Sequence, residues 1–205
     1  SDNTAIGDQA LELNTTGASN TAIGRRALEN NTTGVYQAAI GTNALTGNTT
    51  GYRNSAVGYG AGENITTGVN NTCLGNVSYA SSATVYNEFT LGNGDVSNLR
   101  CADTSISALS DSRDKTNIVD IPLGLTFINL VRPVSFDWDT RDGTRVGKKD
   151  FGFIAQELKT VADATDYANH MRLVSDENPD KLEADPMKMF PILVKAIQEL
   201  SAKVT

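Results

Sequence analysis

A five-residue motif recurs at a fixed interval of 17 residues, and this repeat constrains the fold more than any other feature of the sequence. Its copies begin at Asn3, Asn20, Gln37, Asn54 and Asn71, and each ends in an aliphatic residue followed by glycine. A second motif, Thr-Thr-Gly, has the same interval and ends at Gly17, Gly34, Gly51 and Gly68. A constant period that keeps its glycines in phase indicates one structural unit stacked several times. A disordered linker has no reason to keep apolar residues in phase.

The repeat predicts short strands joined by turns. Each Ala-Ile-Gly run is typical of a short buried strand. Each Thr-Thr-Gly run is typical of a turn in which the glycine has a positive φ angle. The stretch between them, such as residues 25–30, has the composition of a single helical turn.

Each repeat offers few apolar side chains, which bears on how the interior is filled. The second repeat, for example, contributes Ala22, Ile23, Ala27 and Leu28. So few side chains cannot fill the interior of a wide single-chain solenoid. Packing against identical chains would bury them in a shared core instead. We therefore expect a parallel homotrimer with a shared axial core, in the manner of a trimeric β-helix or β-roll-like fibre.

The composition changes near residue 110. Residues 1–109 hold 14 of the 18 glycines, none of the five prolines and only 12 charged residues, whereas residues 110–205 hold 29 charged residues. The recognisable repeat fades after Gly75, and loose alternation follows. We expect a repeat fibre region over 1–83, a narrow β stalk over 84–109 and a separate globular domain over 110–205.

The second half mixes helix and strand signals, which predicts a small α+β domain. Helical spacing over 122–131 is followed by an alternating strand over 134–138. Asp142-Gly143 is a hairpin signal that leads to a second strand over 151–155. A helix around 157–162, a short strand at 172–174 and a polar loop over 175–185 complete the domain.

A longer helix ends the chain and carries an apolar seam. Its apolar residues are spaced 3, 4, 3 and 4, as in the a and d positions of a coiled coil. They are Phe190, Leu193, Ile197, Leu200 and Val204. Two interpretations remain open: a trimeric coiled coil, or a helix packed on its own domain, since two heptads are short.

Charge and the rarity of histidine exclude several classes of function. A net charge of −7 disfavours nucleic-acid and membrane-surface partners, because both require clustered Lys and Arg. His170 is the only histidine, so a zinc site built on several histidines is excluded. Cys73 and Cys101 are too few for a disulfide framework. We expect no metal and no cofactor.

The segment that begins at Ser110 carries a family resemblance. Ser110, Asp111, Arg113 and Lys115 match the pattern Ser-Asp-x-Arg-x-Lys, and two further blocks, 151–157 and 191–200, match in order. Together they resemble the endosialidase-type intramolecular chaperones found at the C-termini of phage tail spikes, tail fibres and neck appendages. The sequence departs from that family at 183–187, where an apolar-Asp-Tyr run is usual. The 17-residue repeats resemble the head repeats of trimeric adhesins.

The resemblance implies that residues 110–205 assemble three chains and are then released by self-cleavage between Leu109 and Ser110. It implies a virion protein, assembled in the host cytoplasm, whose partners are its own copies, the fibre that precedes residue 1 and a host-surface receptor. It implies no external substrate, because the peptidase acts once on its own trimer.

The chemistry of cleavage needs a nucleophile and a base. Ser110 is the nucleophile and Lys115 is the expected base, since His170 lies outside the motif. Five residues of separation suit neither a helix nor a strand, so the pair needs a turn or two different chains. We expect Asp111 to orient Lys115 and Arg113 to stabilise the oxyanion, both as supporting residues.

Two alternatives belong to other classes of protein. One is a structural trimeric adhesin or fibre tip that binds a host-surface receptor and is not cleaved. The other is a tip that binds or cleaves glycans. The sequence disfavours the second, because the repeat has few acids and its tyrosines are scattered.

Overall fold

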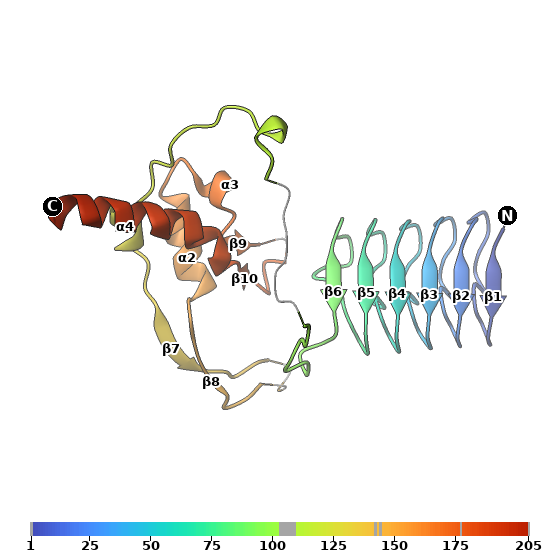
Figure 1. Ribbon diagram of the computed structural model, residues 1–205. Coiled ribbons are helices and arrows are strands. Elements are labelled where there is room, and N and C mark those ends of the chain that lie inside the picture. Colours follow the sequence, from blue (N-terminus) through green and yellow to red (C-terminus); the bar gives the residue numbers. More distant parts are fainter. Residues whose placement is uncertain (1, 103–109, 142, 144, 177, 205) are drawn as a thin grey trace. The chain divides into compact units, whose positions relative to one another are not determined.

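The computed structural model describes residues 2–102, 110–141, 143, 145–176 and 178–204. It divides the chain into two compact units, Ser1–Ser97 and Asn98–Thr205 (Figure 1). The first unit is a parallel β-solenoid and the second contains helices and short strands, which confirms the predicted change of fold class. Leu109 and Asp142, which carry the predicted cleavage bond and hairpin signal, lie outside the described residues.

The solenoid is a row of short parallel strands, one per coil (Figure 1). Each strand residue pairs with the residue 17 positions later, in the next strand, as Ala22 does with Ala39. The strands are β1 (Thr4–Ile6), β2 (Thr21–Ile23), β3 (Ala38–Ile40), β4 (Ser55–Val57), β5 (Thr72–Leu74) and β6 (Phe89–Leu91). Strand β6 continues the register although the motif is lost after Gly75, so a further solenoid coil occupies part of the segment predicted as a stalk.

The interior of each coil is narrow and is filled by its own chain. The middle residue of each inner strand is buried, as are Leu28 and Leu45, which are fully buried. The premise that other chains must fill the interior is therefore wrong, because small residues let the two sides of a coil approach closely. The last residue of each strand points outward instead, and Ile23, Ile40 and Val57 are exposed.

The backbone conformations of the repeat glycines differ from the prediction. Positive φ angles occur in the glycines that follow the strands, such as Gly24 at 131° and Gly41 at 134°, and not in those of the Thr-Thr-Gly turns. Gly17 and Gly34 are required for space, because a Cβ atom there would collide with the carbonyl of the glycine one coil on. The prediction of a helical turn over residues 25–30 is also wrong, since Arg26 and Leu28 have positive φ angles.

A buried ladder of amide side chains joins successive coils. The Oδ1 atom of Asn54 accepts a hydrogen bond from the backbone N–H of Asn71 (3.0 Å), and its Nδ2 atom donates to the carbonyl of Gly68 (2.8 Å). Asn20 bonds in the same way to Gln37 and Gly34. Because an unpaired buried polar group is costly, this ladder stabilises the register of the coils and explains the asparagine that opens four of the five motifs. The side chain of Gln37 instead donates to the Oδ1 atoms of Asn31 and Asn48.

Removing one rung should destabilise the solenoid. We expect Asn54→Ala to lower the free energy of unfolding by about 1–3 kcal/mol, because the N–H of Asn71 and the carbonyl of Gly68 lose their buried partner. Chemical denaturation followed by circular dichroism measures the change. Asn76→Ala, on an exposed position of the following coil, is the matched control and should be neutral. Equal stability of the two variants would contradict the role of the ladder.

The second unit contains four α-helices, two 3₁₀ helices and two small antiparallel sheets within its described residues. In chain order they are η1 (Ser112–Asp114), α1 (Leu125–Ile128), β7 (Val134–Asp137), β8 (Lys149–Gly152), α2 (Ala155–Asp163), α3 (Ala168–Met171), β9 (Val174–Ser175), β10 (Glu183–Ala184), η2 (Pro186–Met189) and α4 (Phe190–Val204). Among the described residues, no helix has the length and apolarity needed to cross a bilayer.

Helix α4 packs on its own unit through one face only. Ile192 and Ala196 are buried, and Ile192 belongs to a core that also includes Phe127 of α1. The carboxylate of Glu199 accepts a hydrogen bond from the backbone N–H of Leu125 (2.8 Å) and so caps the start of α1. The predicted seam residues lie on other positions and are exposed, from 40% at Leu193 to 82% at Val204.

Candidate active site

A tight turn shapes the segment that carries the Ser-Asp-x-Arg-x-Lys motif. Asp111 caps the 3₁₀ helix η1, because its Oδ1 atom accepts a hydrogen bond from the backbone N–H of Arg113 (2.9 Å). The backbone N–H of Lys115 donates to the carbonyl of Ser112 (3.2 Å) and closes the turn. A capping aspartate followed by one 3₁₀ turn is ordinary local chemistry, and it folds the first and last motif residues toward each other.

Ser110 and Lys115 are in direct contact within one chain. The Nζ atom of Lys115 lies 2.6 Å from the Oγ atom of Ser110 and 3.1 Å from its carbonyl oxygen. Both side chains are exposed. This turn is one of the two arrangements that the five-residue spacing allows, and it brings the predicted nucleophile within hydrogen-bond distance of the predicted base. The arrangement does not need a lysine from another chain.

Asp111 and Arg113 are paired with each other. The Nε atom of Arg113 lies 3.0 and 3.1 Å from the two carboxylate oxygens of Asp111, and one Nη atom lies 2.6 Å from Oδ2. The hydrogen bonds from Arg113 hold the pKa of Asp111 below its ordinary value, and the carboxylate raises the pKa of Arg113. Asp111 thus contacts Arg113, whereas the sequence analysis predicted that this carboxylate orients Lys115.

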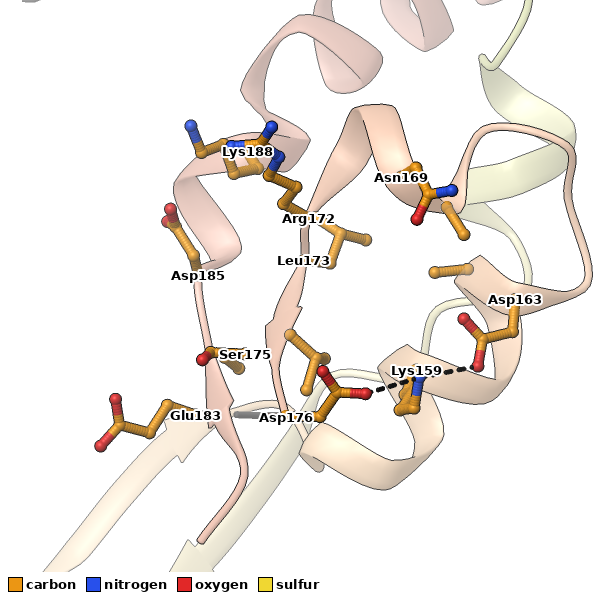
Figure 2. A pocket seen from close by; sticks show the side chains of 14 residues that line it. Lys159, Asp163, Asn169, Arg172, Leu173, Ser175, Asp176, Glu183, Asp185 and Lys188 are labelled. Atoms are coloured by element: carbon orange, nitrogen blue, oxygen red, sulfur yellow. Dashed lines mark ion pairs between the residues drawn. The ribbon is translucent and has the colours of Figure 1, made fainter. Parts of the chain in front are cut away.

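A separate cavity of about 620 Å³ lies between α2, α3 and the short strands β9 and β10 (Figure 2). At one side, Lys159 bridges Asp163 (3.0 Å) and Asp176 (3.1 Å). Arg172 and Lys188 lie together at the other side. None of the motif residues lines this cavity, so it is not part of the Ser110–Lys115 site. No sequence motif indicated this cavity, because its charged residues lie in separate segments of the chain.

The comparisons with known proteins bear on the same segment. Residues 110–170 match the model of a peptidase family described as the chaperone of endosialidase. Searches among curated proteins and among solved structures returned no match. The family match begins at Ser110, the residue that opens the turn, and covers the strands β7 and β8 and the helix α2. The resemblance predicted from the motif is confirmed over this range: residues 110–170 match the chaperone-of-endosialidase family.

Proposed function

We propose that this chain is the C-terminal part of a phage fibre or spike protein that cleaves itself between Leu109 and Ser110. Residues 110–205 drive homotrimerisation and folding of the solenoid and are then released. The observation that carries the proposal is the 2.6 Å contact between Ser110 Oγ and Lys115 Nζ, at the start of the segment that matches the family. The fibre remains in the virion after release.

The proposed reaction is an acyl transfer followed by hydrolysis. Ser110 Oγ attacks the carbonyl carbon of Leu109 while its proton passes to the neutral amine of Lys115. The bond from Leu109 C to Ser110 N then breaks, and the nitrogen takes a proton and leaves as an amine. An ester between Leu109 and Ser110 Oγ remains, and water hydrolyses it to a carboxylate and the free hydroxyl. Asp111 and Arg113 support the reaction by shaping the turn.

Two exposed apolar surfaces support the trimer. The first is the aliphatic column, formed by the exposed last residues of β1 to β4 and of β6: Ile6, Ile23, Ile40, Val57 and Leu91. The second is the seam on α4. Regular apolar rows of this kind are typical of interfaces, and parallel identical chains place the same residue of each chain at the same level of an axis.

The exposure of Ser110 and Lys115 bears on why cleavage would follow assembly. In the single chain both side chains face water. We propose that assembly buries the turn and excludes water from the pair. The fibre would then be cut only after it has formed. Loss of residues 110–205 would leave it kinetically stable, because separated chains could not reassemble without the domain that trimerises them.

The uncleaved protein should be a trimer. We expect Ser110→Ala, which keeps the chain intact, to give a light-scattering mass of three times 21.8 kDa at micromolar concentration. Adding Ile197→Asp should dissociate it, because three carboxylates would meet on the axis. Val194→Asp is the matched control, since Val194 is exposed on α4 but lies outside the seam. A monomeric Ser110→Ala protein would contradict the proposed assembly.

A denaturing gel of the wild-type protein separates this proposal from a non-cleaving adhesin. Two bands, corresponding to residues 1–109 and 110–205, support self-cleavage. A single band at 21.8 kDa after complete assembly supports the adhesin.

A further inference from the structure

One asparagine of the chain is followed by glycine, and the two residues lie in the turn where the solenoid ends. Asn93 and Gly94 come just after β6 and form the only Asn-Gly pair in the sequence. Asn93 is half-buried, whereas Gly94 and Asp95 are exposed. Because glycine has no Cβ atom, the preceding side chain can approach the backbone nitrogen of Gly94 without steric hindrance. The pair therefore combines an electrophilic amide with an accessible nitrogen.

A hydrogen bond within the turn holds the Asn93 side chain beside the next peptide group. The backbone N–H of Asp95 donates to Asn93 Oδ1 (3.1 Å). This bond closes a small ring that contains both the Cγ atom of Asn93 and the backbone nitrogen of Gly94. The same N–H polarises the side-chain carbonyl and stabilises negative charge that develops on Oδ1. Proximity and an oxyanion donor both favour attack of the Gly94 nitrogen on Cγ.

The other asparagines lack this combination, since each is followed by a residue that carries a side chain. Asn54, a member of the ladder, is buried and has both polar atoms hydrogen-bonded, so its side chain is held in the interior. Asn98 is exposed and lies outside helices and strands, as Asn93 does, but the bulky Leu99 follows it. Asn98 is therefore the matched comparison within the same connecting segment.

We propose that Asn93 is a site of spontaneous deamidation. The Gly94 nitrogen loses its proton to solvent and attacks Cγ of Asn93. The bond from Cγ to Nδ2 then breaks, and Nδ2 takes a proton from water and leaves as ammonia. Water opens the remaining cyclic imide at either carbonyl. One product is aspartate in the normal backbone, and the other is isoaspartate, in which the backbone runs through Cγ. The reaction does not depend on Ser110 or Lys115.

Deamidation places two carboxylates in the turn that follows the last coil. Asn93 Nδ2 donates to Asp95 Oδ2 (3.2 Å), and the backbone N–H of Val96 donates to the carbonyl of Asn93 (3.2 Å). Val96 in turn lies against Gly92, because a Cβ atom on that glycine would lie 2.3 Å from a Val96 methyl group. Replacing the Nδ2 donor by a carboxylate oxygen turns an attraction to Asp95 into a repulsion. The modification therefore loosens the turn at the end of the solenoid.

Two variants separate the effect of the new charge from the reaction itself. Asn93→Asp should speed hydrogen exchange of the Val96 amide, because the two carboxylates repel each other and weaken the turn. Adding Asp95→Asn should restore slow exchange, since one carboxylate then faces an amide. Unchanged exchange in Asn93→Asp, or no recovery in the double variant, would overturn the proposed loosening.

The test of the site is incubation of the full chain at mildly alkaline pH, followed by digestion and quantitative peptide mass spectrometry. We expect conversion of amide to acid at Asn93 to be faster than at Asn98 by about tenfold or more, with isoaspartate detected by an isoaspartyl methyltransferase. Gly94→Ala should slow the reaction, because its Cβ atom hinders the nitrogen. An unchanged Asn93, equal rates at the two asparagines, or a wild-type rate in Gly94→Ala would overturn the proposal. The assay reads Asn93 whether or not the chain is cut after Leu109.

Discussion

Ser110→Ala is expected to abolish cleavage and leave the chain folded and assembled. The hydroxyl is exposed and contacts Lys115, so its loss removes the proposed nucleophile without opening a cavity in the core. We expect the rate of fragment formation to fall by at least about 10⁴-fold. A denaturing gel sampled over time measures the rate, and circular dichroism confirms the fold.

The control for this variant lies in the same turn. Ser112 is another exposed serine, two residues on, at the first position of η1. Ser112→Ala should be cleaved at the normal rate. If Ser110→Ala were cleaved as fast as wild type, or if Ser112→Ala were the inactive variant, Ser110 would not be the nucleophile.

Lys115→Arg is expected to be nearly as damaging as the loss of Ser110. Arginine keeps a positive charge within reach of Oγ but stays protonated, so it cannot accept the serine proton. We expect the cleavage rate to fall by about 10²–10⁴-fold, the usual contribution of a general base. Quantitative mass spectrometry of the intact chain and its fragments measures the change.

Two further variants show whether the lysine acts as a base or only as a charge. Lys149→Arg, on the exposed strand β8, controls for the substitution itself and should be cleaved normally. His170→Ala should also be cleaved normally, because the proposed proton transfer does not use an imidazole. Normal cleavage of Lys115→Arg would show that a positive charge suffices and would remove Lys115 as the base.

The repeat illustrates what sequence periodicity can and cannot establish. The interval of 17 residues places the strands and their register, because parallel stacking of identical units demands the same offset throughout. The interval does not reveal the structural reason for each in-phase glycine of the repeat. Gly24 permits a positive φ angle, whereas Gly34 leaves room for the carbonyl of the next coil, and both look alike in the sequence.

The last helix shows the same limit for packing. The 3-4-3-4 spacing predicts α4 and an apolar seam, and both exist. It could not reveal that Ile192 and Ala196 form a second apolar face, which packs on α1 and leaves the seam exposed. A helix with two apolar faces is ambiguous until its neighbours are known.

The candidate site was predictable in part. The motif indicated Ser110 and Lys115, and the spacing argument left open a turn or two different chains. The capping carboxylate of Asp111 supplies the turn. The pairing of Asp111 with Arg113 was not predictable, because four charged side chains in one turn allow several pairings of similar energy.

The most direct test of the account is the intact mass of the fragments from the wild-type protein. If Ser110 attacks the carbonyl before it, the C-terminal fragment must begin with Ser110 and carry a free amine, and the other fragment must end in a free carboxylate at Leu109. Fragments with these two ends, found in wild type and missing in Ser110→Ala, are the predicted result. A wild-type chain that stays intact after assembly, or a cut at any other bond, would contradict the account.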